Sequence, residues 1–214
     1  MNYIYAPGCA LMIYKPHLAD KIKDILTKEY GPIDEVLNCC LFAPQLDKGA
    51  CIITPCVACH HQYAKNYQTI FFLDMLAKSQ SFQFPDYQGI EMTIHDTCTA
   101  RQDDFYLDTV RTLLKRMNIN IVESQYSRKK GICCGQVFYN KLPLDQVEER
   151  MKVRANQMIK EDVVVYCPSC IQSLAVGGKR PHFILDLLFN EETVYKDANI
   201  ENWRNSLKDF QDTH

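Results

Sequence analysis

Cysteine placement is the feature that most constrains how this 214-residue chain folds. Ten of its 11 cysteines divide into two sets of five with one internal order: a single Cys, an adjacent Cys-Cys pair and a Cys-x-x-Cys. The first set is Cys9, Cys39, Cys40, Cys56 and Cys59. The second set is Cys98, Cys133, Cys134, Cys167 and Cys170. Two matched sets in one chain indicate an internal duplication, so we expect two halves of similar fold.

The spacing inside the two sets is unequal. The pair and the Cys-x-x-Cys are 16 positions apart in the first set (Cys40 to Cys56) and 33 apart in the second (Cys134 to Cys167). The second spacer contains an amphipathic helical pattern at 144–160, whereas residues 41–50 of the first spacer are too few for such a crossover helix. The sequence therefore predicts that the first repeat lacks one helix.

Strand and helix patterns alternate along both halves. Strands are predicted at 2–5, 51–54, 91–94 and 163–166, with shorter strand-like segments at 35–37 and 119–123. Helices are predicted at 18–26, 106–117 and 144–160, and one more from about His60 to Leu76. This alternation predicts an α/β fold of two pseudo-symmetric repeats with mostly parallel strands. We expect the cysteines at strand C-terminal ends and helix N-termini, where such sheets bind ligands.

Three segments are expected along the chain. Residues 1–80 form the shortened first repeat, and the polar, proline-containing stretch 79–88 joins it to the second. Residues 89–190 form the second repeat, and 191–214 form a C-terminal helical tail. The apolar residues Trp203, Leu207 and Phe210 of this tail either contact a partner protein or pack on the protein's own core, and we expect the second.

Composition excludes several classes of protein. The 24 basic and 26 acidic residues show no basic excess, so nucleic-acid binding is not expected. No run of 18 apolar residues is present, so no membrane span is expected. The first residues lack a basic stretch followed by an apolar block, and we expect a cytoplasmic protein. In a reducing compartment, thiols are more often metal-binding or catalytic than paired in disulfides.

The number and spacing of the thiols favour a polynuclear site. Five thiolates exceed the four ligands of tetrahedral zinc, and all-sulfur ligation selects zinc, copper(I) or an iron–sulfur cluster. Adjacent cysteines reach two irons of one cluster more easily than they chelate a single ion. An iron–sulfur site is therefore favoured over zinc. The eleventh cysteine, Cys51, lies in an apolar strand and is expected to be a small buried hydrophobe.

The order of the motifs resembles the cysteine-rich CCG domain family, which includes the cysteine-rich subunit of heterodisulfide reductase and related iron–sulfur oxidoreductase subunits. The second half carries Cys98, Cys133-Cys134-Gly135 and Cys167-Pro168-Ser169-Cys170, whereas the first half has Leu41 in place of the motif's glycine. The resemblance implies one non-cubane 4Fe–4S cluster per complete motif, held by five cysteines. It thus implies two clusters on the ten positions above.

The resemblance implies a redox subunit, an oxidoreductase component of anaerobic metabolism. It would take electrons from a flavoprotein or a ferredoxin-like iron–sulfur subunit and pass them to a small disulfide or similar two-electron acceptor. The chain has no G-x-G-x-x-G, so no flavin or nicotinamide site is expected in it. Catalytic residues other than cluster ligands are not assigned. A non-catalytic electron-transfer module and a zinc-bound structural or redox-sensing protein are the alternatives.

Two further segments allow two interpretations each. His95 and Asp96 either place a hydrogen bond on cluster sulfur, which would tune its potential, or form an ordinary turn after a strand. The basic run 127–130 either docks an acidic electron donor or forms a solvated loop.

Overall fold

The computed structural model describes residues 2–42 and 45–214. The chain divides into two compact units. The first unit comprises Met1–Lys78 together with Arg204–His214, and the second comprises Ser79–Trp203. The division falls inside the last helix, α9 (Ile200–Thr213), so each unit receives one part of that helix.

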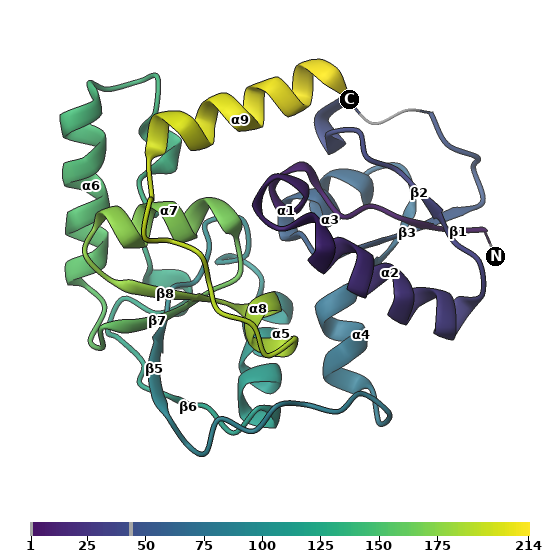
Figure 1. Cartoon of the computed structure of the whole chain (residues 1–214), viewed down its shortest axis with the longest axis horizontal. Helices are drawn as coiled ribbons and strands as arrows, with labels where there is room; N and C mark the ends of the chain where they lie inside the picture. The colour runs from purple at the N-terminus through teal and green to yellow at the C-terminus, as the bar shows by residue number, and fades with distance from the viewer. Residues whose placement is uncertain (1, 43–44) are drawn as a thin grey trace. The chain divides into compact units, whose positions relative to one another are not determined.

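Each unit is built on a four-stranded parallel sheet (Figure 1). The first sheet has the order β2-β1-β3-β4, from β1 (Asn2–Tyr5), β2 (Asp34–Glu35), β3 (Ala50–Thr54) and β4 (Gln68–Phe71). The second has the order β6-β5-β7-β8, from β5 (Glu91–Ile94), β6 (Asn120–Ile121), β7 (Asp162–Val165) and β8 (Arg180–Phe183). All neighbouring strands in both sheets are parallel. The prediction of an α/β fold with two similar halves is confirmed.

The helices alternate with the strands in both units. The first unit contains α1 (Cys9–Tyr14), α2 (Pro16–Tyr30), the short 3-10 helix η1 (Cys40–Phe42), α3 (Val57–Tyr63) and α4 (Phe72–Lys78). The second contains α5 (Asp104–Arg116), η2 (Arg128–Lys130), η3 (Gln136–Phe138), α6 (Leu144–Asn156), α7 (Pro168–Val176) and α8 (Ile184–Leu188). The helices predicted from apolar periodicity at 18–26 and 106–117 are confirmed as α2 and α5.

The helix predicted from about His60 to Leu76 is wrong. The structure has α3, then strand β4, then α4 in that segment. The β4 strand pairs with β3, where Ile53 lies opposite Ile70 and Thr54 lies opposite Phe71. A short apolar run fits both a helix and a strand, and here pairing with a buried neighbouring strand decides between them. The corresponding strand of the second unit, β8, was not predicted either.

Helix α6 is the element that distinguishes the two units. It confirms the helix predicted at 144–160, although it ends at Asn156. Between β2 and β3, the described part of the first unit contains only η1. The longer spacer of the second cysteine set is therefore occupied by an additional helix.

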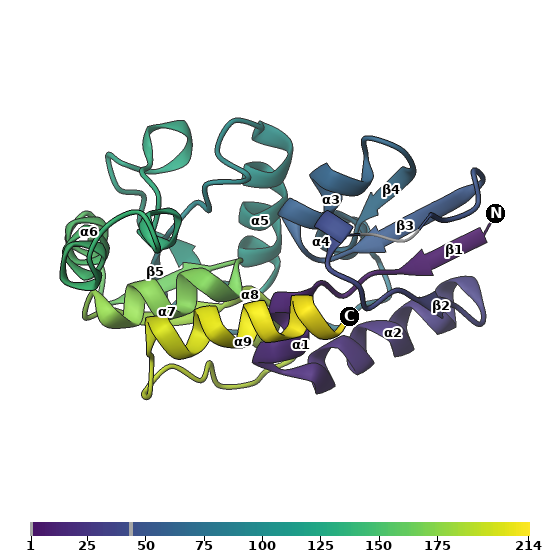
Figure 2. The same ribbon diagram turned by 90° about the horizontal axis from the view of Figure 1, so that it is seen from above.

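Two glycines allow α6 to pack closely on its neighbours. A Cβ at Gly177, which follows α7, would lie 2.5 Å from the Cβ of Ala155 and 3.0 Å from the carbonyl oxygen of Met151. Gly135 has a φ of +108°, and a Cβ there would lie 2.6 Å from Cγ of Met151. Helices α6 and α7 lie side by side in both views (Figures 1 and 2). The close approach of α6 to α7 and to the Gly135 turn thus requires glycine at both positions.

No helix in the described ranges is both long enough and apolar enough to cross a membrane.

The contact at Gly177 predicts a cost of substitution. Gly177→Ala should lower the free energy of unfolding by about 1–3 kcal/mol, because the added methyl group overpacks the interface of α6 with α7. Urea unfolding followed by circular dichroism under anaerobic, reducing conditions would measure it. Gly49→Ala is the control, because a Cβ there meets nothing within 4 Å. Equal stability of the two variants would contradict the prediction.

Candidate metal centre

The first set of five cysteines gathers in the first unit. Cys9 begins α1, Cys40 begins η1, and Cys56 is the N-cap residue of α3. Hydrogen bonds between thiols join Cys9 to Cys39, Cys39 to Cys40, Cys40 to Cys59, and Cys59 to Cys56. Side chains that are up to 50 positions apart in the sequence thus become neighbours.

Proton affinities within this set differ. Burial, followed by the charge of Cys39, raises the pKa of Cys9 to about 12. Hydrogen bonding to the Cys59 thiol lowers the pKa of Cys40 to about 7 and raises that of Cys59. Cys40 is thus the most readily ionised of these three thiols, whereas Cys9 and Cys59 hold their protons. A metal that binds them all would release these protons.

The second set gathers in the same way in the second unit. Hydrogen bonds join Cys98 to Cys133, Cys133 to Cys134, Cys134 to Cys170, and Cys170 to Cys167. Cys167 is the N-cap residue of α7. Its pKa is lowered to about 7 by the Cys170 thiol and then by backbone N–H groups of the first turn. Unpaired N–H groups at a helix start stabilise a thiolate in this way.

His95 lies against the second set. It is fully buried, and one ring nitrogen lies within 4.8 Å of the sulfurs of Cys134 and Cys170. Arg154 donates from Nε to Nδ1 of His95 at 2.9 Å. Because the Arg154 guanidinium has only donors, Nδ1 of His95 is the acceptor and the ring carries its proton on Nε2. His95 therefore presents an N–H donor from Nε2.

Asp96 has a separate role. Its buried carboxylate accepts from both terminal nitrogens of Arg111, at 3.0 and 2.9 Å. It also accepts from the Tyr166 hydroxyl at 3.1 Å and from the backbone N–H of Arg128 at 2.6 Å. These bonds fix the loop that leads to Cys133, so Asp96 is a structural anchor.

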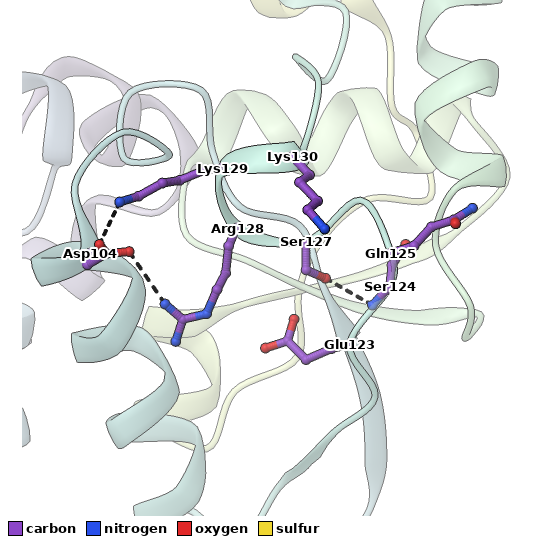
Figure 3. A pocket seen from close by; sticks show the side chains of 8 residues that line it. All are labelled: Asp104, Glu123, Ser124, Gln125, Ser127, Arg128, Lys129 and Lys130. Atoms are coloured by element: carbon purple, nitrogen blue, oxygen red, sulfur yellow. Dashed lines mark hydrogen bonds and ion pairs between the residues drawn. The ribbon is translucent and has the colours of Figure 1, made fainter.

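The basic run 127–130 borders a cavity of about 440 Å³ (Figure 3). Arg128 forms ion pairs with Asp108 at 2.5 Å and Asp104 at 3.6 Å, and Lys129 pairs with Asp104 at 2.6 Å. Glu123 also lines the cavity and pairs with Arg111. Acidic side chains of the same unit thus neutralise much of the run, which favours the solvated-loop interpretation over docking.

Unpaired buried donors show whether a cluster fits these sites. Nε2 of His95, Nη2 of Arg154 and the Tyr63 hydroxyl are buried without a partner within the described chain. The charges of Cys59, Cys40 and Cys39 act on Tyr63, which places it beside the first set. Buried donors require acceptors, and donors beside metal-bound sulfur are a common surrounding of such centres. Both sets therefore fit an electron-rich group held by thiolates.

The positions of Arg154 and Tyr63 beside the cysteines were not predicted from the sequence. Arg154 occupies the buried face of α6 together with Val147 and Met151, at positions that helical spacing assigns to the core. A charged residue at a core position was thus a readable signal. For Tyr63 the signal was weaker, because a tyrosine on an apolar helix face is ordinary.

Cys51 lies apart from both sets. It is 3% exposed in β3, where it pairs with Tyr3 and Gln68. Burial raises its pKa, and no cysteine acts on it. All eleven cysteines are free thiols.

The last helix, α9, makes polar contacts in both units. In the second unit, Trp203 is buried, and its Nε1 donates to Oγ of Ser169 at 3.0 Å. In the first unit, Gln211 donates to the sulfur of Cys39 at 3.4 Å. The expectation that the tail packs through Trp203 is confirmed.

The second set coincides with a known domain. Residues 92–175 match the CCG family, a cysteine-rich domain. This span of the CCG domain contains all five cysteines of the second set. The resemblance predicted from the motifs is confirmed here.

One curated relative is the EtfAB:quinone oxidoreductase of Syntrophomonas wolfei subsp. wolfei. It is 24% identical over 135 residues, which cover 55% of this chain but only 18% of the relative. A solved structure, Picrophilus torridus aspartate racemase, aligns over 97% of this chain and 95% of its own at 10% identity, with a TM-score of 0.37, too low to indicate a shared fold. The CCG domain and the oxidoreductase relative support an iron–sulfur redox subunit with a metal cluster.

The isolated position of Cys51 generates a prediction. Cys51→Ala should keep the iron content of the wild type and lower the free energy of unfolding by roughly 1 kcal/mol, because only packing is lost. Iron analysis and urea unfolding would measure both. Loss of about half the iron would instead mean that the short first spacer recruits Cys51 as a ligand.

Proposed function

We propose that this chain is an iron–sulfur redox subunit similar to the cysteine-rich subunit of heterodisulfide reductase, with one non-cubane 4Fe–4S cluster on each set of five cysteines. The observation that carries the proposal is the convergence of five thiols within the span that matches the CCG domain. The first set gathers in a unit with the same strand order. Such clusters supply one-electron transfer at their irons.

The ligands would divide their roles by position. Cys56 and Cys167, each at the N-cap of a helix, would bind as thiolates beside the backbone N–H groups of the first turn. The adjacent pairs Cys39-Cys40 and Cys133-Cys134 would each contribute two sulfurs to one cluster. Tyr63 and His95 would donate hydrogen bonds toward the bound sulfur of the first and second sets.

A small acceptor would meet the first set at Cys40. Cys40 borders a cavity of about 230 Å³, together with Leu41, Gln45, Gln62, Tyr63, Asn66 and Tyr67. The amide and phenol groups that line this cavity can orient a small polar molecule such as a disulfide. Two electrons and two protons would convert the disulfide into two thiols. The electrons would come from a flavoprotein or a ferredoxin-like iron–sulfur subunit.

A second candidate is an electron-transfer module that meets no small substrate. The relative's name, EtfAB:quinone oxidoreductase, pairs EtfAB with a quinone and mentions no disulfide. In that case the clusters would relay electrons between partner proteins.

Metal content tests the cluster proposal. Protein isolated anaerobically under iron-replete conditions should be brown and contain about eight irons and a similar amount of acid-labile sulfide per chain, at four per cluster. Exposure to air should release them. Stoichiometric zinc with negligible sulfide would show that the chain is a zinc protein instead.

Reaction with a disulfide separates the two candidate functions. Dithionite-reduced protein, freed of excess reductant, should be reoxidised by a small disulfide with release of two thiols for each pair of electrons. Gln62→Ala, which alters the cavity beside Cys40 but no proposed ligand, should slow this reaction about tenfold, the effect of one lost hydrogen bond of about 1.4 kcal/mol. Loaded protein that reduces a quinone analogue but no disulfide would favour the electron-transfer module.

A further inference from the structure

Arg154 is a buried cation without a carboxylate partner in the described ranges. Its side chain is completely buried, at 0% exposure. Nε donates to His95, and Nη1 donates to Oε1 of Gln157 at 2.8 Å and to the carbonyl of Tyr126 at 3.3 Å. Nη2 has no partner among the residues that the structure describes. An unpaired buried charge costs several kcal/mol, so this position requires a nearby negative charge.

As ligands of a cluster, the sulfurs of the second set would supply this negative charge. Burial, and then the charge of Arg101, lower the pKa of Arg154 to about 10, and Asp96, Cys170 and Cys134 act in the opposite direction. Asp96 is already satisfied by two hydrogen bonds from Arg111. Neighbouring thiols raise the pKa of Cys134 and of Cys170, so both would be anions as thiolate ligands of a cluster, and they are then the partners that remain for Arg154.

His95 connects Arg154 with the sulfurs of Cys134 and Cys170. Arg154 occupies its Nδ1, so the proton is on Nε2, which is buried and unpartnered within residues 2–42 and 45–214. A ring nitrogen of His95 lies within 4.8 Å of both sulfurs. The arrangement is a cation, an oriented imidazole and two thiol ligands in sequence.

The first set has no such arrangement in the described part of the chain. The main influences on the pKa values of Cys9, Cys40 and Cys59 are burial, other thiols and backbone N–H groups. Arg154 lies on α6, and the described residues between β2 and β3 contain no corresponding helix. The two sets therefore differ in electrostatic surroundings although their ligands correspond.

We propose that Arg154 and His95 are a positioning pair that raises the reduction potential of the second cluster above that of the first. The inference rests on the proposed clusters. Reduction adds an electron to the metal centre, and a buried cation and an N–H donor favour the added negative charge. The second centre is therefore reduced first.

Potentiometric titration of the loaded full-length chain, monitored by electron paramagnetic resonance, tests the pair. Each proposed cluster would accept one electron from dithionite, and the wild type should show two transitions. In Arg154→Met, the ratio of reduced to oxidised second cluster at a fixed potential should fall about tenfold, equivalent to 59 mV for one electron. The first transition should stay in place and serves as an internal reference.

Matched variants separate charge and hydrogen bonding from general disturbance of the helix. Arg150→Met changes an exposed arginine of the same helix and should leave both transitions unchanged. His95→Leu removes the donor and should lower the second transition. His95→Gln keeps an N–H donor and should restore much of that loss.

The outcomes distinguish this inference from the proposed function. Wild-type potentials in loaded Arg154→Met would overturn the inference and leave the clusters in place. If Arg154→Met loses half its iron, Arg154→Lys, which keeps the cation, should retain most of the wild-type potential, and His95→Leu decides, because a wild-type potential in His95→Leu would overturn the inference. Wild-type protein without iron and sulfide would overturn the proposed function and the inference with it.

Discussion

The arrangement of both units follows from the need to bring together thiols that are far apart in the sequence. In each sheet the two central strands are adjacent and parallel, with Tyr5 opposite Ile53 in the first and Ile94 opposite Val164 in the second. One central strand precedes the single cysteine, and the other precedes the Cys-x-x-Cys. Parallel strands end at the same edge of a sheet. The single cysteine and the Cys-x-x-Cys, which follow two adjacent strands, therefore lie close together at that edge. The Cys-Cys pair follows the edge strand beside the first central strand, which is β2 in the first sheet and β6 in the second.

Buried charge is arranged differently in the two units. The second unit buries Asp96, His95 and Arg154, and each contacts another polar group. Asp96 is satisfied within the protein, whereas Arg154 lacks a carboxylate in the part of the chain that the structure describes. A polar network with one unsatisfied member is costly unless a ligand completes it. The second site thus offers a buried positive charge in addition to its five thiols, and this charge favours an anionic group there.

Periodicity and motif order predicted much of this fold, and the failures have physical causes. Strands β1 and β5 and helix α6 were predicted because each combines a clear pattern with an adjacent motif. Strand β4 was missed because Ile70 and Phe71 fit a helix equally well until the neighbouring strand is known. The gathering of the cysteines was expected from the parallel strands, whose C-terminal ends meet the starts of the following helices. Helical spacing marks Arg154 as a charged residue at a core position, but its proposed role depends on the distance between α6 and the cysteines, which the sequence does not give and which close packing at Gly177 sets.

The position of Trp203 gives the molecule an intrinsic optical reporter. It is the single tryptophan of the chain, and its indole bonds to Ser169, which lies between Cys167 and Cys170. A strongly absorbing iron–sulfur centre at these cysteines would accept excitation energy from the indole and quench its fluorescence. Tryptophan emission would therefore report the occupancy of the second site without a label.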